Sequence, residues 1–501
     1  MSAPAAYDDL RTRLAEISDL AGIGQLLFWD QQTKMPVAAA ASRAEQTATI
    51  GRLSHQLFVS DEIGRLLDEL RGYEESLPED SDEASLIRVA RHDWGKARQV
   101  PPDLTAEMRR SASLALRAWA EARPKSDYEA LKPHLERNLG LRRRYLDCFE
   151  PGDEPYDVLL DDYERGMKTA EVRAVFERLK EGLIELLHTV EPADSSPLDR
   201  PFPQEGQERF AMHVLDRFGF DPASWRIDTT AHPFMSSPGQ GDIRLTTHYS
   251  KSGLHSLFAT MHEFGHGIYE FGIDAALART PLGTGASMGL HESQSRMWEN
   301  LVGRSRPFWS HFYPELQQTF PGALDDVDEE SFFRAVNAVR PSLIRVDADE
   351  VTYSLHIILR FELEQAMLAD DFRLDQLPEE WNRRMWEYLG IEVPDDTTGV
   401  LQDVHWSGGS IGYFPTYALG NLISAQIWDR IAVELPDLPD AIEAGDFAPL
   451  RDWLRENLHR HGRKFTPAET LERVVGTPQI DPEPYVRYLR EKLAGIYGIA
   501  A

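Results

Sequence analysis

The chain has 501 residues, 42% of them hydrophobic and 10% aromatic, so it can bury a large core and is not disordered by composition. Fifty-three basic residues against 83 acidic ones give a formal net charge of −30, which disfavours nucleic acid and anionic membrane surfaces as partners. The single cysteine, Cys148, excludes a disulfide within the chain and a cysteine-based zinc site.

The N-terminus lacks the basic segment and the apolar run of a secretory signal peptide. No stretch approaches the ~20 apolar residues that a membrane span requires. We therefore expect a soluble, cytoplasmic protein.

Apolar residues recur at three- and four-residue steps through much of the chain, which is typical of amphipathic helices. In the first such stretch, Leu10, Leu14 and Ile17 fall on one face. The same spacing predicts helices over residues 7–29, 104–122, 127–148, 169–190, 254–272, 350–369, 420–434 and 483–497.

Two short passages, residues 225–230 and 242–249, are rich in Ile, Thr and Tyr instead. They flank a Ser-Ser-Pro-Gly-Gln-Gly turn at 236–241, so they are predicted to pair as a small sheet. No repeat, Gly/Ser linker or low-complexity tract divides the chain. We expect one domain over residues 1–501, mainly α-helical with a small β element.

One of the predicted helices contains His262-Glu263-Phe-Gly265-His266. Its two histidines lie one turn apart on one face, as two imidazoles must to hold one Zn²⁺ at ~2.0–2.1 Å. Glu263 could act as general base toward a metal-activated water. Gly265 and Gly267 each lower helix propensity by about 1 kcal/mol, and we expect them to clear space beside the ligands.

A catalytic zinc site also needs a third protein ligand and an open position. Residues 290–300 read as a second helix that carries His291, Glu292 and Glu299. The two glutamates are seven residues apart and share a face, so either could be the third ligand, whereas His291 points elsewhere. The alternative is a pair of structural histidines in the core.

Further segments occur in a recognisable order: Phe28-Trp-Asp-Gln31, Asp242-Ile-Arg-Leu-Thr246, Ile344-Arg-Val-Asp-Ala-Asp349 and Gly399-Val-Leu-Gln-Asp-Val-His-Trp406. Together with the two candidate metal segments, they make the sequence resemble the carboxypeptidase Taq family, also called thermostable carboxypeptidase 1. The resemblance extends from near the N-terminus past residue 420 and so covers nearly the whole chain.

The resemblance implies a mostly helical, single-domain homodimer with a deep substrate groove and a small β-sheet near the zinc site. It implies release of single residues from peptide C-termini, with Glu292 as third ligand and Glu263 as the base. The expected metal is Zn²⁺, for which Co²⁺ could substitute.

An enzyme that acts on C-termini must recognise a carboxylate, and the planar fork of arginine suits this task. Arg244 and Arg345 are therefore the candidate substrate anchors. Each could instead form a structural ion pair. For Arg345, the nearby Asp347 and Asp349 are the candidate partners.

His405 could donate a hydrogen bond to the substrate or to the oxyanion, with Gln402 or Asp403 orienting its neighbours. It could equally be a satisfied core histidine. The Gly-rich segment that follows carries Tyr413 and Tyr417, and a tyrosine hydroxyl there could stabilise the oxyanion. We favour Tyr413.

Two other functions compete with a carboxypeptidase. A helical zinc oligopeptidase would cut peptides internally, including peptides with a C-terminal amide. A non-catalytic helical scaffold with a vestigial site would bind no stoichiometric metal, although the intact Glu263 argues against it.

Overall fold

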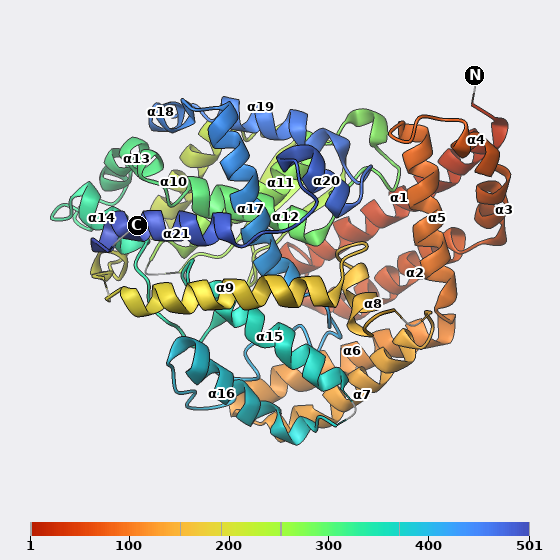
Figure 1. Cartoon of the computed structure of the whole chain (residues 1–501), viewed down its shortest axis with the longest axis horizontal. Coiled ribbons are helices and arrows are strands. Elements are labelled where there is room, and N and C mark those ends of the chain that lie inside the picture. Colours follow the sequence, from red (N-terminus) through yellow and green to blue (C-terminus); the bar gives the residue numbers. More distant parts are fainter. Residues whose placement is uncertain (1–2, 151, 192, 251–252, 370, 500–501) are drawn as a thin grey trace. The chain divides into compact units, whose positions relative to one another are not determined.

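The computed structural model describes residues 3–150, 152–191, 193–250, 253–369 and 371–499. Helices make up most of the described chain, together with one three-stranded sheet, which confirms the mainly α-helical fold class (Figure 1). Within the described residues, no helix has both the length and the apolar character needed to cross a membrane.

The chain forms two compact units, each assembled from three separate segments. The first comprises Met1–Arg98, Ser195–Val336 and Ile427–Gln479. The second comprises Gln99–Asp194, Asn337–Gln426 and Ile480–Ala501. A single domain over residues 1–501, with a deep groove, stays a prediction.

The first unit contains the sheet and most of the helices. In chain order its elements are α1 (Ala5–Thr33), α2 (Ala40–Phe58), α3 (Asp61–Glu69), α4 (Arg71–Glu75), α5 (Asp82–Gln99), α10 (Gln204–Phe218), β1 (Trp225–Thr229), β2 (Met235–Gly239), β3 (Asp242–Thr247), α11 (His255–Gly272), α12 (Met288–Arg296), α13 (Arg306–Thr319), α14 (Glu329–Val336), α18 (Leu438–Glu443), α19 (Ala448–Asn457) and α20 (Pro467–Val475).

The second unit is helical. Its elements are α6 (Pro102–Ala122), α7 (Tyr128–Leu146), α8 (Tyr156–Asp161), α9 (Thr169–Thr189), α15 (Tyr353–Leu368), α16 (Leu377–Leu389) and α21 (Glu483–Tyr497). Helix α17 (Pro415–Glu434) has residues in both units.

All eight helices predicted from periodicity are present, as α1, α6, α7, α9, α11, α15, α17 and α21. Their ends differ from the predicted ones by a few residues, as expected for helix termini. In α1 the start of the periodic face is buried, with Leu10 and Leu14 almost fully buried, whereas Ile23 and Leu26 further along are exposed.

The predicted sheet is confirmed, but the turn within it is shorter than expected. Residues Met235–Gly239 form strand β2, and the chain reverses at Gly241, which has a φ of 75°. The strand order is β1-β3-β2, with β1 parallel and β2 antiparallel to the central β3. Residues 225–229 and 242–247 therefore pair side by side in parallel and are not the two arms of one hairpin.

Helix α11 packs directly on this sheet. A Cβ added to Gly267 would come within 2.6 Å of the Trp225 side chain and 2.8 Å of that of Ile243, so only glycine allows this contact. Beside it, Phe264 stacks on Trp225 with ring centroids 5.2 Å apart. The sheet thus supports the helix that carries the His-Glu-x-x-His segment, as expected.

Candidate functional site

His262 and His266 project from one face of α11. Their ring centroids lie 4.9 Å apart, as expected for side chains one helical turn apart. Met261 and Phe264 are fully buried, which fixes the rotation of the helix. Glu263 is itself buried, with 6% of its surface exposed.

Gly265 lets a second helix approach this face. A Cβ on Gly265 would lie 2.4 Å from the backbone oxygen of Gln294, so any other residue would push α12 away. The approach brings Oε2 of Glu292 to 3.6 Å from Nε2 of His262 and 3.5 Å from Nε2 of His266. The predicted space-clearing role of Gly265 therefore has a physical basis.

These three side chains fit a divalent metal. Their ligand atoms lie within 4.8 Å of one another. Two atoms bound at about 2.05 Å to one tetrahedral ion would be ~3.3 Å apart, close to the two distances to Glu292. Two imidazoles and one carboxylate are also a donor set found in catalytic zinc sites.

The other candidate ligand, Glu299, occupies a different place. It lies on a π-helical turn, Met297–Val302, that continues α12, and it contacts His262 and Arg296, as Glu292 does. Its Oε2 is 2.8 Å from Nδ1 of His262, the ring nitrogen opposite the one that faces Glu292. Glu299 therefore orients a candidate ligand.

His266 is held in a similar way. Its Nδ1 lies 3.1 Å from the backbone oxygen of His291 and 2.7 Å from Nδ1 of the same residue. Nε2 of His291 lies 3.0 Å from a carboxylate oxygen of Glu270. Contacts of this kind fix the tautomer and the orientation of a metal-binding imidazole.

Burial and neighbouring charges give the three carboxyl groups of this cluster different pKa values. Burial raises the pKa of Glu263 to about 7. Burial also opposes ionisation of Glu292, but Arg296 and His262 hold its pKa well below the ordinary value. Glu299 behaves similarly, with a pKa lowered to about 2 by Arg296 and His262 against its burial. Glu292 is thus ionised and could serve as an anionic ligand, while the raised pKa of Glu263 is of the kind that a general base requires.

A second buried cluster, in the second unit, is centred on Asp403. Its carboxylate accepts hydrogen bonds from Nη2 of Arg345 at 2.8 Å and from Nε of Arg360 at 2.7 Å. Arg345 also donates to the hydroxyl of Tyr353 at 3.0 Å. The partner of Arg345 is therefore Asp403, while Asp349 accepts hydrogen bonds from backbone groups nearby.

His405, Tyr413 and Tyr417 lie beside these arginines. Nε2 of His405 is 3.3 Å from the Tyr417 hydroxyl, and its ring stacks on Tyr413 at a centroid distance of 5.7 Å. The guanidinium of Arg345 lies 4.9 Å from the centre of the Tyr417 ring. Burial lowers the pKa of His405 to about 4, so it is neutral at neutral pH.

Arg244 lies on β3 in the first unit and is half-buried. Its Nε and Nη2 both donate to Asp242 at 2.8 Å, and its guanidinium lies 4.3 Å from the Trp29 ring. The paired position on β1, Arg226, stacks on the same ring and bonds Asp228. Both arginines are thus engaged by an aspartate and by the Trp29 ring, which favours the structural alternative for Arg244.

The family model described as carboxypeptidase Taq (M32) metallopeptidase matches residues 9–493. The chain belongs to this family. Thermostable carboxypeptidase 1 of Thermus thermophilus is 42% identical over 514 residues, covering 99% of this chain and 100% of that protein. Carboxypeptidase 1 of Bacillus subtilis is 36% identical, covering 98% of each.

Among solved structures, an M32 carboxypeptidase from Deinococcus radiodurans matches with a TM-score of 0.95 at 40% identity, covering 99% of this chain and 100% of that one. The protein is therefore an M32 metallocarboxypeptidase. Family membership implies a divalent metal, and His262, His266 and Glu292 form a possible site for it.

Several residues in or near the two clusters were not anticipated from the sequence. Arg360 and Glu364 lie one turn apart on α15 and are fully buried. Charged residues in so apolar a helix are a signal that could have been noticed, because buried charges are rare unless paired. Arg296 gave no such signal, since it follows the polar run Ser293-Gln-Ser295.

Proposed function

We propose that this M32 metallocarboxypeptidase releases single amino acids from peptide C-termini, with Zn²⁺ held by His262, His266 and Glu292. The supporting observation is the convergence of three ligand atoms beside the buried Glu263. Co²⁺, which accepts the same donors, could replace Zn²⁺.

A bound divalent ion would supply Lewis acidity toward a water molecule and toward the scissile carbonyl. Glu263 would accept the proton of the attacking water and later pass it to the leaving amine. With a pKa near 7, its carboxyl group can do both at neutral pH. Glu299 and His291 would keep the two imidazoles in the tautomer that leaves Nε2 unprotonated.

Substrate recognition would fall to the arginine cluster. Asp403 is shared by Arg345 and Arg360, so one positive charge of the trio is left without a carboxylate. A peptide C-terminal carboxylate has the charge and the planar shape that a guanidinium recognises. We assign this role to Arg345, and to Arg244 only as a secondary anchor, because Asp242 already occupies two of its donors.

His405 and Tyr413 complete the proposal as hydrogen-bond donors to the substrate or the oxyanion. A neutral His405 can donate from one nitrogen while the other accepts, which suits this task. Tyr417 is an equal candidate for the tyrosine role, because its hydroxyl contacts His405 and its ring contacts Arg345.

The test is mass spectrometry of products from one peptide prepared with a free C-terminus and with a C-terminal amide. We expect stepwise loss of single residues from the free acid, no cleavage of the amide, and no reaction after chelation. Internal cleavage of both peptides would establish an endopeptidase instead. Substoichiometric metal and an uncleaved free acid would favour a non-catalytic scaffold.

Self-association as a homodimer belongs to the same proposal. Helix α2 has 19 residues, all of them described, and none is buried. Leu53 and Leu57 are about 40% exposed on it, and Phe28 on α1 is 49% exposed. A second copy could cover these side chains, which sedimentation of the wild type and of a Leu53→Glu/Leu57→Glu variant would test.

A further inference from the structure

The segment that carries His405 and Tyr413, residues 403–414, has no regular secondary structure. Side chains proposed to touch a substrate must nevertheless be held to within a fraction of an ångström. The contacts that hold this segment therefore determine whether its side chains can act.

Glu364 of α15 bonds to the segment at two points six residues apart. Its Oε1 accepts from the Trp406 indole at 2.8 Å, and its Oε2 accepts from the backbone N–H of Gly412 at 2.9 Å. The Tyr156 hydroxyl on α8 donates to the same Oε2. Trp406 follows His405 directly, and Gly412 precedes Tyr413 directly, so Glu364 holds the immediate neighbours of both.

No arginine, lysine or histidine among the described residues forms an ion pair with this carboxyl group, although it is fully buried. An unpaired buried carboxyl group is costly and destabilises the fold unless hydrogen bonds compensate. The segment supplies two of the three compensating bonds. Gly412 also packs closely against α8. It has a φ of 94°, and a Cβ added to it would lie only 2.8 Å from the Cβ of Leu159.

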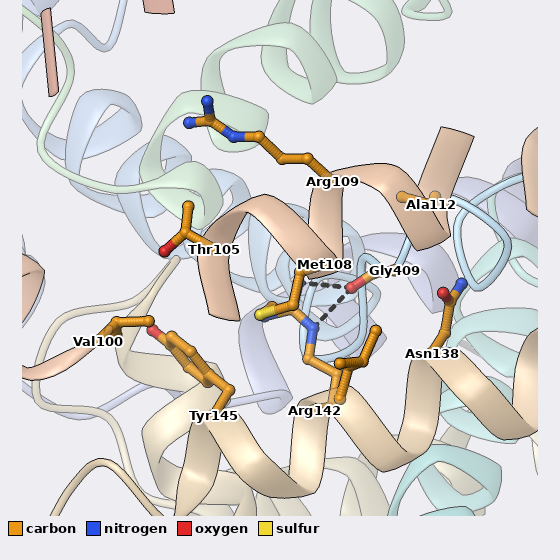
Figure 2. Close-up of a pocket in the computed structure, with 11 residues that line it drawn as sticks. Val100, Thr105, Met108, Arg109, Ala112, Asn138, Arg142, Tyr145 and Gly409 are labelled. Carbon is orange, nitrogen blue, oxygen red and sulfur yellow. Dashed lines mark hydrogen bonds between the residues drawn. The ribbon is translucent and has the colours of Figure 1, made fainter. Parts of the chain in front are cut away.

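Helix α7 holds the same segment from a different side. Asn138 donates to the carbonyl oxygens of Trp406 and Ser407, and one turn later Arg142 donates twice to that of Gly409. Figure 2 shows Arg142 reaching Gly409. Both residues line a cavity of about 270 Å³, together with other residues of α6 and α7. Asn138 and Arg142 thus donate to backbone carbonyl oxygens of the segment, whereas Glu364 accepts from two of its N–H groups.

We propose that Glu364 is a positioning residue for the reaction: by accepting from Trp406 and Gly412 it sets the places of His405 and Tyr413. This inference rests on the proposed function for the role of those two side chains. Glu364 itself does not touch the substrate.

The test variant is Glu364→Gln, because glutamine keeps the shape of the side chain but replaces one acceptor by an N–H₂ donor. That donor faces the N–H groups of the segment. Glu362→Gln is the matched control: Glu362 lies on the same helix and bonds Lys180 and Tyr388, and the structure records no bond from it to residues 403–414. Trp406→Phe is a milder second variant that removes one donor only.

Hydrogen exchange of residues 405–413 and peptide-hydrolysis kinetics are measured on all three variants, at matched metal content. Glu364→Gln should speed exchange in this segment and lower kcat/KM about tenfold or more, with kcat affected as well as KM. Trp406→Phe should show a smaller change in the same direction, and Glu362→Gln should stay within about twofold of wild type.

Unchanged exchange at 405–413 in Glu364→Gln, or equal kcat/KM in the two glutamine variants, would overturn the proposal. If Glu364→Gln does not fold, Trp406→Phe decides by the same two measurements. Failure of the proposed function would look different: the wild type itself would release no C-terminal residue, while hydrogen exchange would still report on Glu364.

Discussion

The two buried charge clusters of this protein are built from opposite kinds of group. In the first unit, two imidazole nitrogens and a carboxylate oxygen converge, each offering a lone pair. In the second unit, two guanidinium groups converge on the single carboxylate of Asp403. The side chains of both clusters are buried or half-buried, so an uncompensated charge in either cluster has a larger effect than it would at the surface.

The charges left unpaired in each cluster indicate which kind of ligand it would bind. Lone pairs that face one another at about 3.5 Å repel unless a cation lies among them, so the first cluster suits a metal. The second cluster has two positive charges and one negative charge, so it suits an anion such as a carboxylate. Changes to the first cluster should therefore alter metal content, and changes to the second should alter substrate binding alone.

The largest effect is expected from loss of a metal ligand. His262→Ala and Glu292→Gln should each bind less than one metal ion per chain and lose activity by about 10⁴-fold or more. Metal content by mass spectrometry and hydrolysis rates check this. His248→Ala, an exposed histidine of the same unit, should keep both. Full metal content in His262→Ala would refute the ligand set.

Glu263→Gln should keep the bound metal but lose most of the hydrolytic activity. The amide cannot accept a proton, so kcat should fall by about 10² to 10⁴-fold while metal content stays at the wild-type level. Full activity in this variant would remove Glu263 from the mechanism.

Arg345→Lys should weaken recognition of the substrate and leave the metal content unchanged. Lysine keeps the positive charge but loses the planar fork, so kcat/KM should fall about 10- to 100-fold. A loss of metal content by about 10- to 100-fold in this variant would contradict the assignment of the metal to the first cluster and of the substrate to the second. Steady-state kinetics with a free-acid peptide, beside metal analysis, measures both.

Glu299→Gln should weaken metal binding about tenfold without abolishing it, because Glu299 acts through the outer nitrogen of His262. Competition with a chelator of known affinity gives the change in dissociation constant. A loss as complete as in Glu292→Gln would show that Glu299 is itself a ligand.

The smallest effect concerns pH. Burial lowers the pKa of His405 in the folded protein to about 4, whereas an unfolded histidine has a pKa of about 6.5. As the pH falls below about 6.5, the unfolded chain therefore takes up a proton at this residue before the folded protein does. The free energy of unfolding should decline by about 1 to 3 kcal/mol from this residue between pH 6.5 and pH 4. Urea unfolding should show a shallower decline in His405→Gln. Equal slopes for both proteins would mean that His405 has the same pKa in the folded and unfolded states.

Much of the first cluster could be predicted from the sequence because its geometry is local. Two histidines four positions apart on a helix must share a face, and Glu263 must lie beside them. The resemblance to the family added Glu292, and its position matches that assignment. Spacing alone left Glu299 open, because it cannot tell which of the two carboxylates faces Nε2 of His262 and which faces Nδ1.

The second cluster was harder to predict, because its members come from distant parts of the chain. Arg345 was identified, but its partner Asp403 is 58 residues away, and two nearer aspartates were equally plausible. Glu364 was missed altogether, since only the fold brings α15 against Trp406 and Gly412.

The sequence by itself determined the eight periodic helices, two strands of the sheet and the pair of histidines on α11, because periodicity and i,i+4 spacing act within one element. Only the tertiary structure decided which residues complete each cluster. The close approach of α12 at Gly265 and the sharing of Asp403 by two arginines depend on packing between elements, and no local pattern encodes such distances.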